Sequence, residues 1–210
     1  MSGGCFITFE GIEGSGKTTQ LKLLATHLRE RGQRVVAVRE PGGTPLGEKL
    51  REVLLHPESD PVPLAELFLL EAARAQLTAQ VIVPALAAGA FVLADRYADS
   101  SLAYQAAGRG LPWEQVATLN AVACAGVVPH RTVLLELPVA ISLSRARRRP
   151  STTATNRRFE DETLAFHARV AEGYQHLARQ FPDRVRIVDG TGPAEAVQQR
   201  VLAALRGVLP

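Results

Sequence analysis

The chain has 210 residues, 46% of them hydrophobic, and a formal net charge of +3 at pH 7. This length suits one α/β domain with a sizeable core, so a single domain over residues 1–210 is expected. The weak positive charge gives no reason to expect nucleic-acid binding, and the sequence has no apolar run of about 18 residues that would predict a membrane span. No basic stretch followed by an apolar one opens the chain, which favours a cytoplasmic location.

Short apolar runs alternate with helical patterns along the chain. Strands are predicted at residues 5–9, 34–38, 90–95, 131–137 and 184–189. Helices are predicted at residues 17–32, 47–55, 64–89 (with a kink or a new turn at Pro84), 100–107, 113–126, 139–149 and 194–209. This alternation predicts an α/β fold with a five-stranded parallel sheet and helices on both faces. Ligands bind beyond the carboxyl ends of the strands in such sheets, so the segments that follow the strands form the candidate site.

The segment GIEGSGKT, residues 11–18, follows the first predicted strand and opens the first predicted helix. It fits the pattern G-x-x-x-x-G-K-[ST], in which backbone N–H groups and a lysine surround a polyphosphate. Lys17 is expected to reach the β- and γ-phosphates of ATP, and Thr18 to ligate Mg²⁺. A glycine turn with a chance lysine is the alternative, but it does not account for the position between a strand and a helix. The expected nucleotide-binding residues are Gly11, Ile12, Glu13, Gly14, Ser15, Gly16, Lys17, Thr18 and Thr19.

Glu13 is an acid in the middle of this loop. A phosphate repels a neighbouring carboxylate, so Glu13 is expected to have a different partner.

The third predicted strand ends in FVLADRY, residues 91–97. Asp95 could hold Mg²⁺ or its waters, and Arg96 could clamp a phosphate. The alternative is a surface ion pair at a strand–helix junction. The loop motif favours the functional interpretation, because the ends of the two strands should meet at one site. The segment REPGGT, residues 39–44, follows the second strand and is by itself typical of a Pro-Gly turn.

An arginine-rich run covers residues 144–162. Its middle has poor helix propensity and no apolar face, which predicts a mobile lid at about residues 148–160 whose arginines close over the phosphates. The alternative is a basic patch for nucleic acid, but only Phe159 could stack on a base there. The five histidines have no metal-ligand spacing and are interpreted as surface or packing residues.

The segments FEGIEGSGKTTQ, REPGGT, EKLREVLL, AARAQL and DRYADSSLAYQAAGRG, with the arginine-rich run, resemble the bacterial thymidylate kinases. The resemblance runs in register over nearly the whole chain, and REPGGT followed by DRY…S…AYQ…GRG is specific to that family. It implies a three-layer P-loop NTPase fold and phosphoryl transfer from Mg²⁺-ATP to dTMP, giving dTDP and ADP for DNA synthesis. It also implies a homodimer.

The resemblance assigns Glu13 to the loop acid that binds the 3′-OH of the deoxyribose. Some relatives place a catalytic arginine in this loop, but this chain has none there, so the lid should supply one. RRFEDE resembles the lid end of the bacterial type and points to Arg158, with Arg157 and Arg149 as neighbours that could substitute. The implied catalytic residues are Lys17, Arg158, Arg96 and Glu13.

The remaining acceptor-side positions also follow from the resemblance. Arg74 matches the arginine that reads the O4 edge of thymine, and Tyr104 matches the tyrosine that crowds the sugar 2′ position. Where the family commonly has a Phe that stacks on thymine, this chain has Leu70. Either Leu70 forms a flatter apolar wall or the register is locally shifted toward Phe68. The phosphate pocket matches Arg51, Arg96, Glu40 and Pro41, and the base-binding positions match Ser101 and Gln105.

Two other functions remain open. The enzyme could phosphorylate another nucleotide or a nucleoside, although Arg51 and Arg96 favour an acceptor that already carries a phosphate. The chain could instead be a nucleotide switch or a nucleic-acid-binding NTPase anchored by the arginine run. ADP formation with and without dTMP distinguishes these functions.

Overall fold

The computed structural model describes residues 3–56, 58–148 and 158–210. Its centre is a parallel sheet of five strands in the order β2-β3-β1-β4-β5. The strands are β1 (Cys5–Glu10), β2 (Val35–Arg39), β3 (Phe91–Asp95), β4 (Arg131–Glu136) and β5 (Val185–Asp189). All five predicted strands are confirmed to within one residue at either end.

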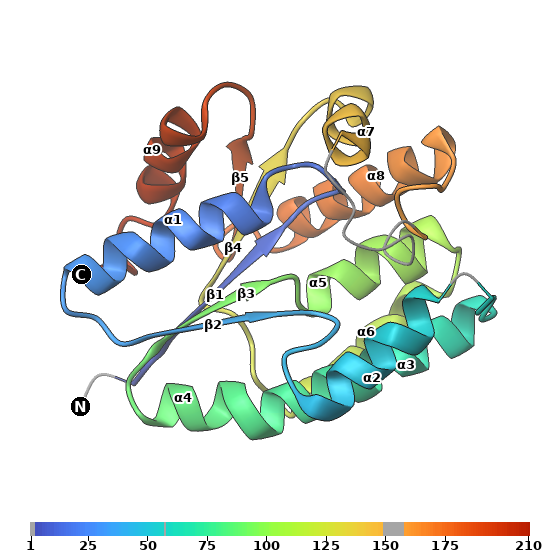
Figure 1. Cartoon of the computed structure of the whole chain (residues 1–210), viewed down its shortest axis with the longest axis horizontal. Helices are drawn as coiled ribbons and strands as arrows, with labels where there is room; N and C mark the ends of the chain where they lie inside the picture. Colours follow the sequence, from blue (N-terminus) through green and yellow to red (C-terminus); the bar gives the residue numbers. More distant parts are fainter. Residues whose placement is uncertain (1–2, 57, 149–157) are drawn as a thin grey trace.

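Two helical layers cover the sheet (Figure 1). The helices are α1 (Lys17–Glu30), α2 (Pro45–Leu55), α3 (Pro63–Leu77), α4 (Val83–Ala87), α5 (Ala98–Ser101), α6 (Trp113–Cys124), α7 (Val139–Arg147), α8 (Leu164–Gln180) and α9 (Ala194–Ala204), with the π-helical segments η1 (Thr78–Ile82) and η2 (Leu102–Gly108). In Figure 1, α1 and α9 lie on one side of the strands, and α3 and α4 lie on the other. The predicted α/β fold with helices on both faces is confirmed.

The alternation of side chains along β1 explains the two layers. Ile7 and Phe9 are fully buried in one apolar cluster with Leu24 of α1 and Val201 of α9. Phe6 points to the opposite face and is buried against η1 and α4. Since successive side chains of a strand point to opposite faces, one central strand is buried on both sides.

The helix predicted over residues 64–89 is three segments in the structure: α3, η1 and α4. Pro84 has no N–H to donate, so an uninterrupted α-helical hydrogen-bond ladder cannot run through it. The widened turn of η1 comes directly before the helix that contains Pro84. A second widened segment, η2, continues from α5 and covers most of the helix predicted at residues 100–107.

The predicted lid, about residues 148–160, lies largely outside the described residues, and so do Arg149 and Arg157. Within the described ranges, no helix is both long enough and apolar enough to cross a membrane.

Candidate active site

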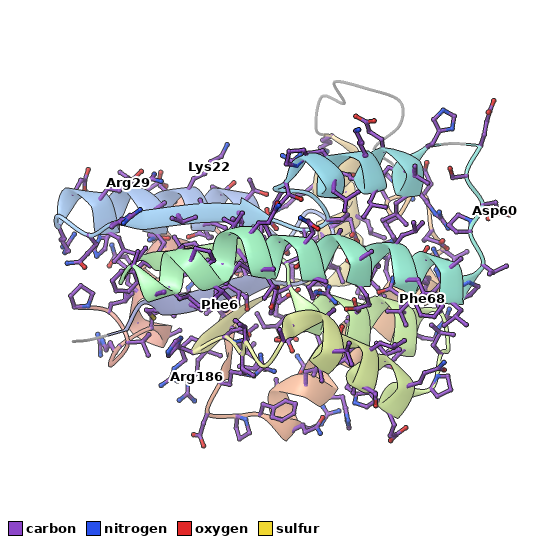
Figure 2. All side chains as sticks on the ribbon, turned by 90° about the horizontal axis from the view of Figure 1, so that it is seen from below. Phe6, Lys22, Arg29, Asp60, Phe68 and Arg186 are labelled. Atoms are coloured by element: carbon purple, nitrogen blue, oxygen red, sulfur yellow. The ribbon has the colours of Figure 1, made fainter. Side chains whose placement is uncertain are left out.

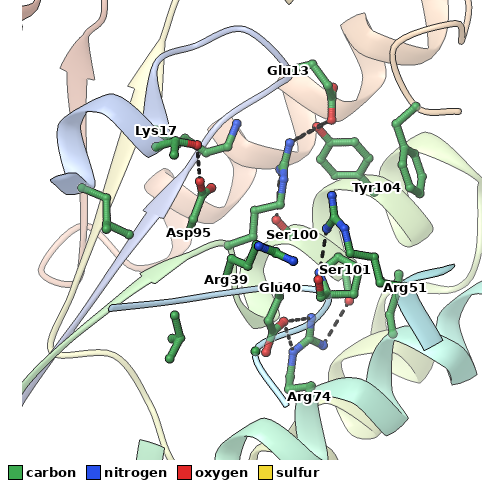
Figure 3. A pocket seen from close by; sticks show the side chains of 18 of the residues that line it. Glu13, Lys17, Arg39, Glu40, Arg51, Arg74, Asp95, Ser100, Ser101 and Tyr104 are labelled. Carbon is green, nitrogen blue, oxygen red and sulfur yellow. Dashed lines mark hydrogen bonds and ion pairs between the residues drawn. The ribbon is translucent and has the colours of Figure 1, made fainter. Parts of the chain in front are cut away.

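A pocket of about 660 Å³ opens at the carboxyl ends of β1, β2 and β3 (Figure 3). Parallel pairing sets Phe9 of β1 and Arg39 of β2 beside Asp95 of β3, so the segments that follow these strands converge. Of the predicted site residues, the pocket is lined by Glu13, Gly14, Lys17, Thr18, Glu40, Pro41, Arg51, Leu70, Arg74, Asp95, Arg96, Ser101, Tyr104 and Gln105. The described lining does not include Gly11, Ile12, Ser15, Gly16, Thr19 or Arg158.

The loop between β1 and α1 packs tightly against α7. Gly14 has a positive φ of 77°, and a Cβ added there would lie 1.9 Å from the carbonyl oxygen of Ser142. Ser142 also donates a hydrogen bond from Oγ to the carbonyl oxygen of Glu13, at 2.7 Å. Ile12 contributes only backbone to the loop, because its side chain is buried in the apolar core. Glycine is therefore required where the loop passes closest to α7.

Lys17 reaches back across this loop. Its Nζ donates to the carbonyl oxygens of Gly11 and Ile12, both at 2.8 Å, and to Oγ of Ser15 at 3.3 Å. Burial, reinforced by the positive charge of Arg96, lowers the pKa of Lys17 to about 7. An anionic phosphate in the pocket would favour the charged form of this lysine again.

Thr18 and Asp95, the two predicted metal ligands, lie together. The hydroxyl of Thr18 donates a hydrogen bond to Oδ2 of Asp95. A hydroxyl and a carboxylate are the hard oxygen donors that Mg²⁺ prefers, so the pair fits this ion. In the described part of the chain, no group of three or more His, Cys, Asp or Glu side chains could hold a metal ion. A Mg²⁺ here would therefore take further ligands from phosphate and water, as it commonly does.

Glu13 is paired with protein groups at the acceptor side of the pocket. Its Oε1 accepts hydrogen bonds from Nη2 of Arg96 at 2.8 Å and from the hydroxyl of Tyr104 at 2.7 Å (Figure 3). Burial alone would raise the pKa of Glu13, but Arg96 and Lys17 outweigh it and lower that pKa. Glu13 is thus a carboxylate at neutral pH.

Arg96 connects the two sides of the pocket. Its Nη1 donates to the carbonyl oxygen of Gly11 at 3.1 Å, to Oγ of Ser100 at 3.2 Å and to the hydroxyl of Tyr174 at 3.1 Å. Its guanidinium also lies over the ring of Tyr104, 4.8 Å from the centroid. A single side chain therefore fixes the phosphate loop, α5, η2 and α8 relative to one another.

Arg74 occupies the far end of the pocket and is only 1% exposed. Its Nε donates to Oε2 of Glu40 at 2.9 Å. Its Nη1 contacts Oε1 of Glu71 at 2.6 Å, Oδ1 of Asn120 at 2.7 Å and Oγ of Ser101 at 3.1 Å. Burial opposes the charge of Arg74, but Glu40 and Glu71 outweigh it and raise the arginine pKa further. Arg74 therefore remains a cation in a dry environment.

At this end of the pocket, the buried Arg74 forms ion pairs with two buried carboxylates, Glu40 and Glu71. Burial raises the pKa of Glu40 to about 7 against the pull of Arg74, and the charge of Glu71 adds to the increase. The second oxygens of both acids, Oε1 of Glu40 and Oε2 of Glu71, are buried and have no hydrogen bond within the described residues. This end of the pocket therefore has an excess of acceptors.

Two further arginines, Arg51 and Arg39, lie in the pocket between Lys17 and Arg74 (Figure 3). Arg51 donates from Nη1 to the carbonyl oxygen of Pro41 at 3.0 Å, as expected if both belong to one phosphate pocket. Arg39 also lines the pocket and pairs with Glu48 at 2.6 Å, although the sequence analysis assigned it no role. Its sequence signals were its place after a predicted strand and at the start of REPGGT.

The positions of Leu70 and Phe68 bear on the two interpretations of the apolar wall. Leu70 lines the pocket, whereas Phe68 is 52% exposed on α3 (Figure 2). This arrangement favours Leu70 over Phe68 as the apolar wall, and the role of Leu70 stays a prediction.

Arg158 does not reach the pocket in this structure. Its Nη2 pairs with Oε2 of Glu66 at 3.0 Å, and its Nη1 donates to the carbonyl oxygen of Leu54 at 3.1 Å. Glu66 is fully buried and also accepts from Arg109 and Gln105. Because a buried carboxylate strongly favours a paired cation, it holds Arg158 at the α2–α3 connection. The catalytic assignment of Arg158 stays a prediction.

Two buried groups beside Glu13 and Arg96 were missed. Glu10 accepts from the backbone N–H of Tyr97 at 2.7 Å, from Ser100 at 2.6 Å and from Tyr174 at 2.8 Å. Burial and the nearby Asp99 raise the pKa of Glu10. The sequence pattern that could have identified Glu10 is an acid at the end of a predicted strand, directly before the glycine-containing loop.

The other missed group is His167, which is fully buried in α8 beside Glu13. His167 lies on the same face of α8 as the buried Val170, Tyr174 and Leu177. The helical spacing of these four residues is visible in the sequence and was the signal for a buried histidine.

The comparisons with known proteins agree over nearly the whole chain. The family model described as thymidylate kinase matches residues 9–201. The thymidylate kinase of Trichlorobacter lovleyi is 51% identical over 207 residues, which cover 95% of this chain and 98% of that protein. The thymidylate kinase of Deinococcus radiodurans is 48% identical over 205 residues, which cover 98% of each chain. The crystal structure of thymidylate kinase from Ehrlichia chaffeensis matches with a TM-score of 0.78 at 32% identity, covering 97% of this chain and 99% of that one. The chain belongs to the thymidylate kinase family.

Proposed function

We propose that this protein transfers the γ-phosphoryl group of ATP to dTMP and produces dTDP and ADP. The observation that carries the proposal is one pocket with Lys17 of a phosphate loop at one end and the buried Arg74 at the other. Membership of the thymidylate kinase family supports the same reaction. The unbroken sheet, with strands from Cys5 to Asp189, supports a single domain.

The donor side consists of the phosphate loop and the end of β3. Loop N–H groups and Lys17 bind the β- and γ-phosphates of ATP. When bound by Thr18 and Asp95, Mg²⁺ supplies charge neutralisation at the phosphates. Lys17 stabilises the charge that develops on the transferring group, and its dry surroundings strengthen that interaction.

The acceptor phosphate lies near Arg51 and Arg96 and the Glu40–Pro41 turn. These groups hold a phosphate oxygen of dTMP in line with the γ-phosphorus of ATP. A new P–O bond forms to that oxygen while the bond to the β-phosphate oxygen of ADP breaks. Glu13 accepts a hydrogen bond from the 3′-OH of the sugar, and Tyr104 excludes a 2′-OH.

The base binds against Leu70, with polar groups around its edge. Gln105 Oε1 is buried and has no hydrogen bond in the described residues, so it can accept from the N3–H of thymine. Arg74 donates to O4, for which it must exchange one existing bond. The 3.3 Å contact from Nη2 to the carbonyl oxygen of Tyr97 is the longest of these bonds and the easiest to exchange. Ser101 is the third polar side chain placed at the edge of the base.

Three further expectations belong to the proposal. Arg158 acts as the catalytic arginine only if it leaves Glu66 for the phosphates. A homodimer is proposed through the face formed by α3 and α6, because the apolar side chains of Phe68 and Val122 are 52% and 74% exposed there. Sedimentation velocity tests whether the protein is a dimer. The cytoplasmic location stays a prediction.

The deciding experiment is ADP formation from ATP with dTMP, dUMP, dCMP, dGMP and UMP as separate acceptors. We expect dTMP to give the highest kcat/KM and ATP alone to give almost no ADP. Slow ADP formation that no acceptor accelerates would identify a nucleotide switch and overturn the proposal.

A further inference from the structure

The buried imidazole of His167 faces the loop acid Glu13. Its Nδ1 lies 3.4 Å from Oε2 of Glu13, and His167 is fully buried. Neither ring nitrogen of His167, nor Oε2 of Glu13, has a well-aligned hydrogen bond within the described residues, and the backbone of Phe159 is the other polar group beside the imidazole. Three buried polar atoms thus lie together without a well-aligned hydrogen bond.

Unsatisfied buried polar atoms are costly, so such an arrangement needs a physical reason. A small rotation of the ring would align an Nδ1–H with Oε2 of Glu13 and satisfy both groups, because the 3.4 Å between these atoms is only slightly longer than a normal N–H···O hydrogen bond. The neutral imidazole has a tautomer with the proton on Nδ1, so no positive charge is required.

The two oxygens of Glu13 have separate partners. Oε1 accepts hydrogen bonds from Arg96 and Tyr104, while Oε2 lies beside the ring of His167 in α8. A carboxylate held at one oxygen only can rotate about its terminal bond, whereas one held at both oxygens keeps one orientation.

We propose that His167 is a positioning residue that donates from Nδ1 to Oε2 of Glu13 and so orients this carboxylate toward the sugar 3′-OH of the acceptor. The inference rests on the proposed function, since it deepens the assignment of Glu13. His167 touches neither nucleotide and acts only through the acid.

Three substitutions of His167 test the proposal. His167→Phe keeps the ring and removes both nitrogens, His167→Asn keeps an amide near the place of Nδ1, and His167→Gln moves the amide toward Nε2. His167→Phe should raise the KM for dTMP roughly 10- to 100-fold, the range for a hydrogen bond to a charged group, while the KM for ATP stays the same. His167→Asn should restore most of this loss and His167→Gln should not.

The matched control is His176→Phe on the same helix. His176 is exposed and lies edge-on to Trp113, so this variant should keep the wild-type KM for dTMP. The ratio of kcat/KM for dTMP over its 3′-deoxy analogue should fall in His167→Phe and remain unchanged in the control. An unchanged ratio in His167→Phe, or better rescue by Gln than by Asn, would overturn the proposal.

A second measurement does not need turnover or a folded His167 variant. ¹⁵N NMR of histidine-labelled protein without nucleotides reports the tautomer of each ring. The proposal expects His167 to carry its proton on Nδ1, with a resonance that shifts in Glu13→Gln. A proton on Nε2 that is indifferent to Glu13→Gln contradicts it. The proposed function fails separately, if the wild-type protein does not phosphorylate dTMP.

Discussion

The hydroxyl of Thr18 donates a hydrogen bond to Asp95, a residue 77 positions further along the chain. Parallel pairing of β1 with β3 brings the two together, because the phosphate loop follows the first strand and Asp95 ends the other. Motifs that are distant in sequence thus form one candidate magnesium site.

Asp95→Asn should raise the free Mg²⁺ concentration needed for half-maximal rate by about tenfold or more. The substitution keeps an oxygen in place but removes the negative charge that attracts the cation. The measurement is the initial rate against free Mg²⁺ at fixed ATP, with Asp183→Asn as a control at an exposed position. An unchanged Mg²⁺ dependence would show that Asp95 does not serve the metal.

Lys17 should leave a signature in the pH dependence of stability. Its folded pKa of about 7 lies below the ordinary value of 10.5, so the unfolded chain binds more protons between these limits. The unfolding free energy therefore rises with pH across this window, and the cost of burying the charged lysine is fully present only below pH 7. Relative to Lys17→Met, the wild type should gain roughly 1 kcal/mol per pH unit in nucleotide-free urea titrations at pH 7, 8 and 9. A difference that stays constant with pH contradicts the assignment.

Arg74 predicts which pyrimidines are accepted. It donates at the 4-position, where thymine and uracil present an acceptor but cytosine presents an amino group. We expect dCMP to be rejected, because its amino group would oppose a buried cation. Discrimination against dUMP should be weaker, because one methyl group in an apolar pocket is worth only about 1–3 kcal/mol. The values of kcat/KM for the three acceptors test this, and use of dCMP as readily as dTMP would exclude the role of Arg74.

Arg158 and Arg109 form a matched pair, since both bind Glu66 and both side chains are 17% exposed. If Arg158 is the catalytic arginine, Arg158→Ala should lower kcat by about 10³-fold, as loss of an arginine finger does, with little change in the KM for dTMP. Arg109→Ala should keep kcat within a few-fold of wild type. Equal losses in both variants would show that the pair only anchors the chain at Glu66.

Leu70→Ala should raise the KM for dTMP about fivefold to tenfold, because it removes an apolar wall of the pocket. The KM for ATP should stay the same, since Leu70 is on α3, the helix that carries Arg74 at the end of the pocket away from Lys17. Acceptor titrations at saturating ATP, and ATP titrations at saturating dTMP, separate the two effects. An unchanged KM for dTMP would mean that the base does not rest on Leu70.

The sheet could be predicted from sequence because each strand is a short apolar run, as in β1 with Phe6, Ile7 and Phe9. The helix ends were harder to predict. A helical period continues through Thr78–Ile82, and only the backbone geometry reveals the widened turn before Pro84.

The pocket was predictable at the end of a strand, as for Asp95 and the adjacent Arg96, and in the loop motif that contains Lys17. The position of Arg158 was not, because it depends on Glu66, a buried acid in a distant helix. His167 was interpreted only by its lack of metal-ligand spacing. Its contact with Glu13 depends on how α8 packs against the phosphate loop, which no local pattern encodes.

Arg96 has a backbone φ of 74°, in the left-handed region that costs a residue with a Cβ about 1–2 kcal/mol. Glycine would relieve that cost but would remove the guanidinium that contacts Gly11, Glu13 and Tyr104. The most stable residue at this position and the residue that the pocket uses are therefore different. A search for thermostable variants that scores folding alone would therefore select against Arg96. The resulting protein would be more stable, but its pocket would lack the guanidinium.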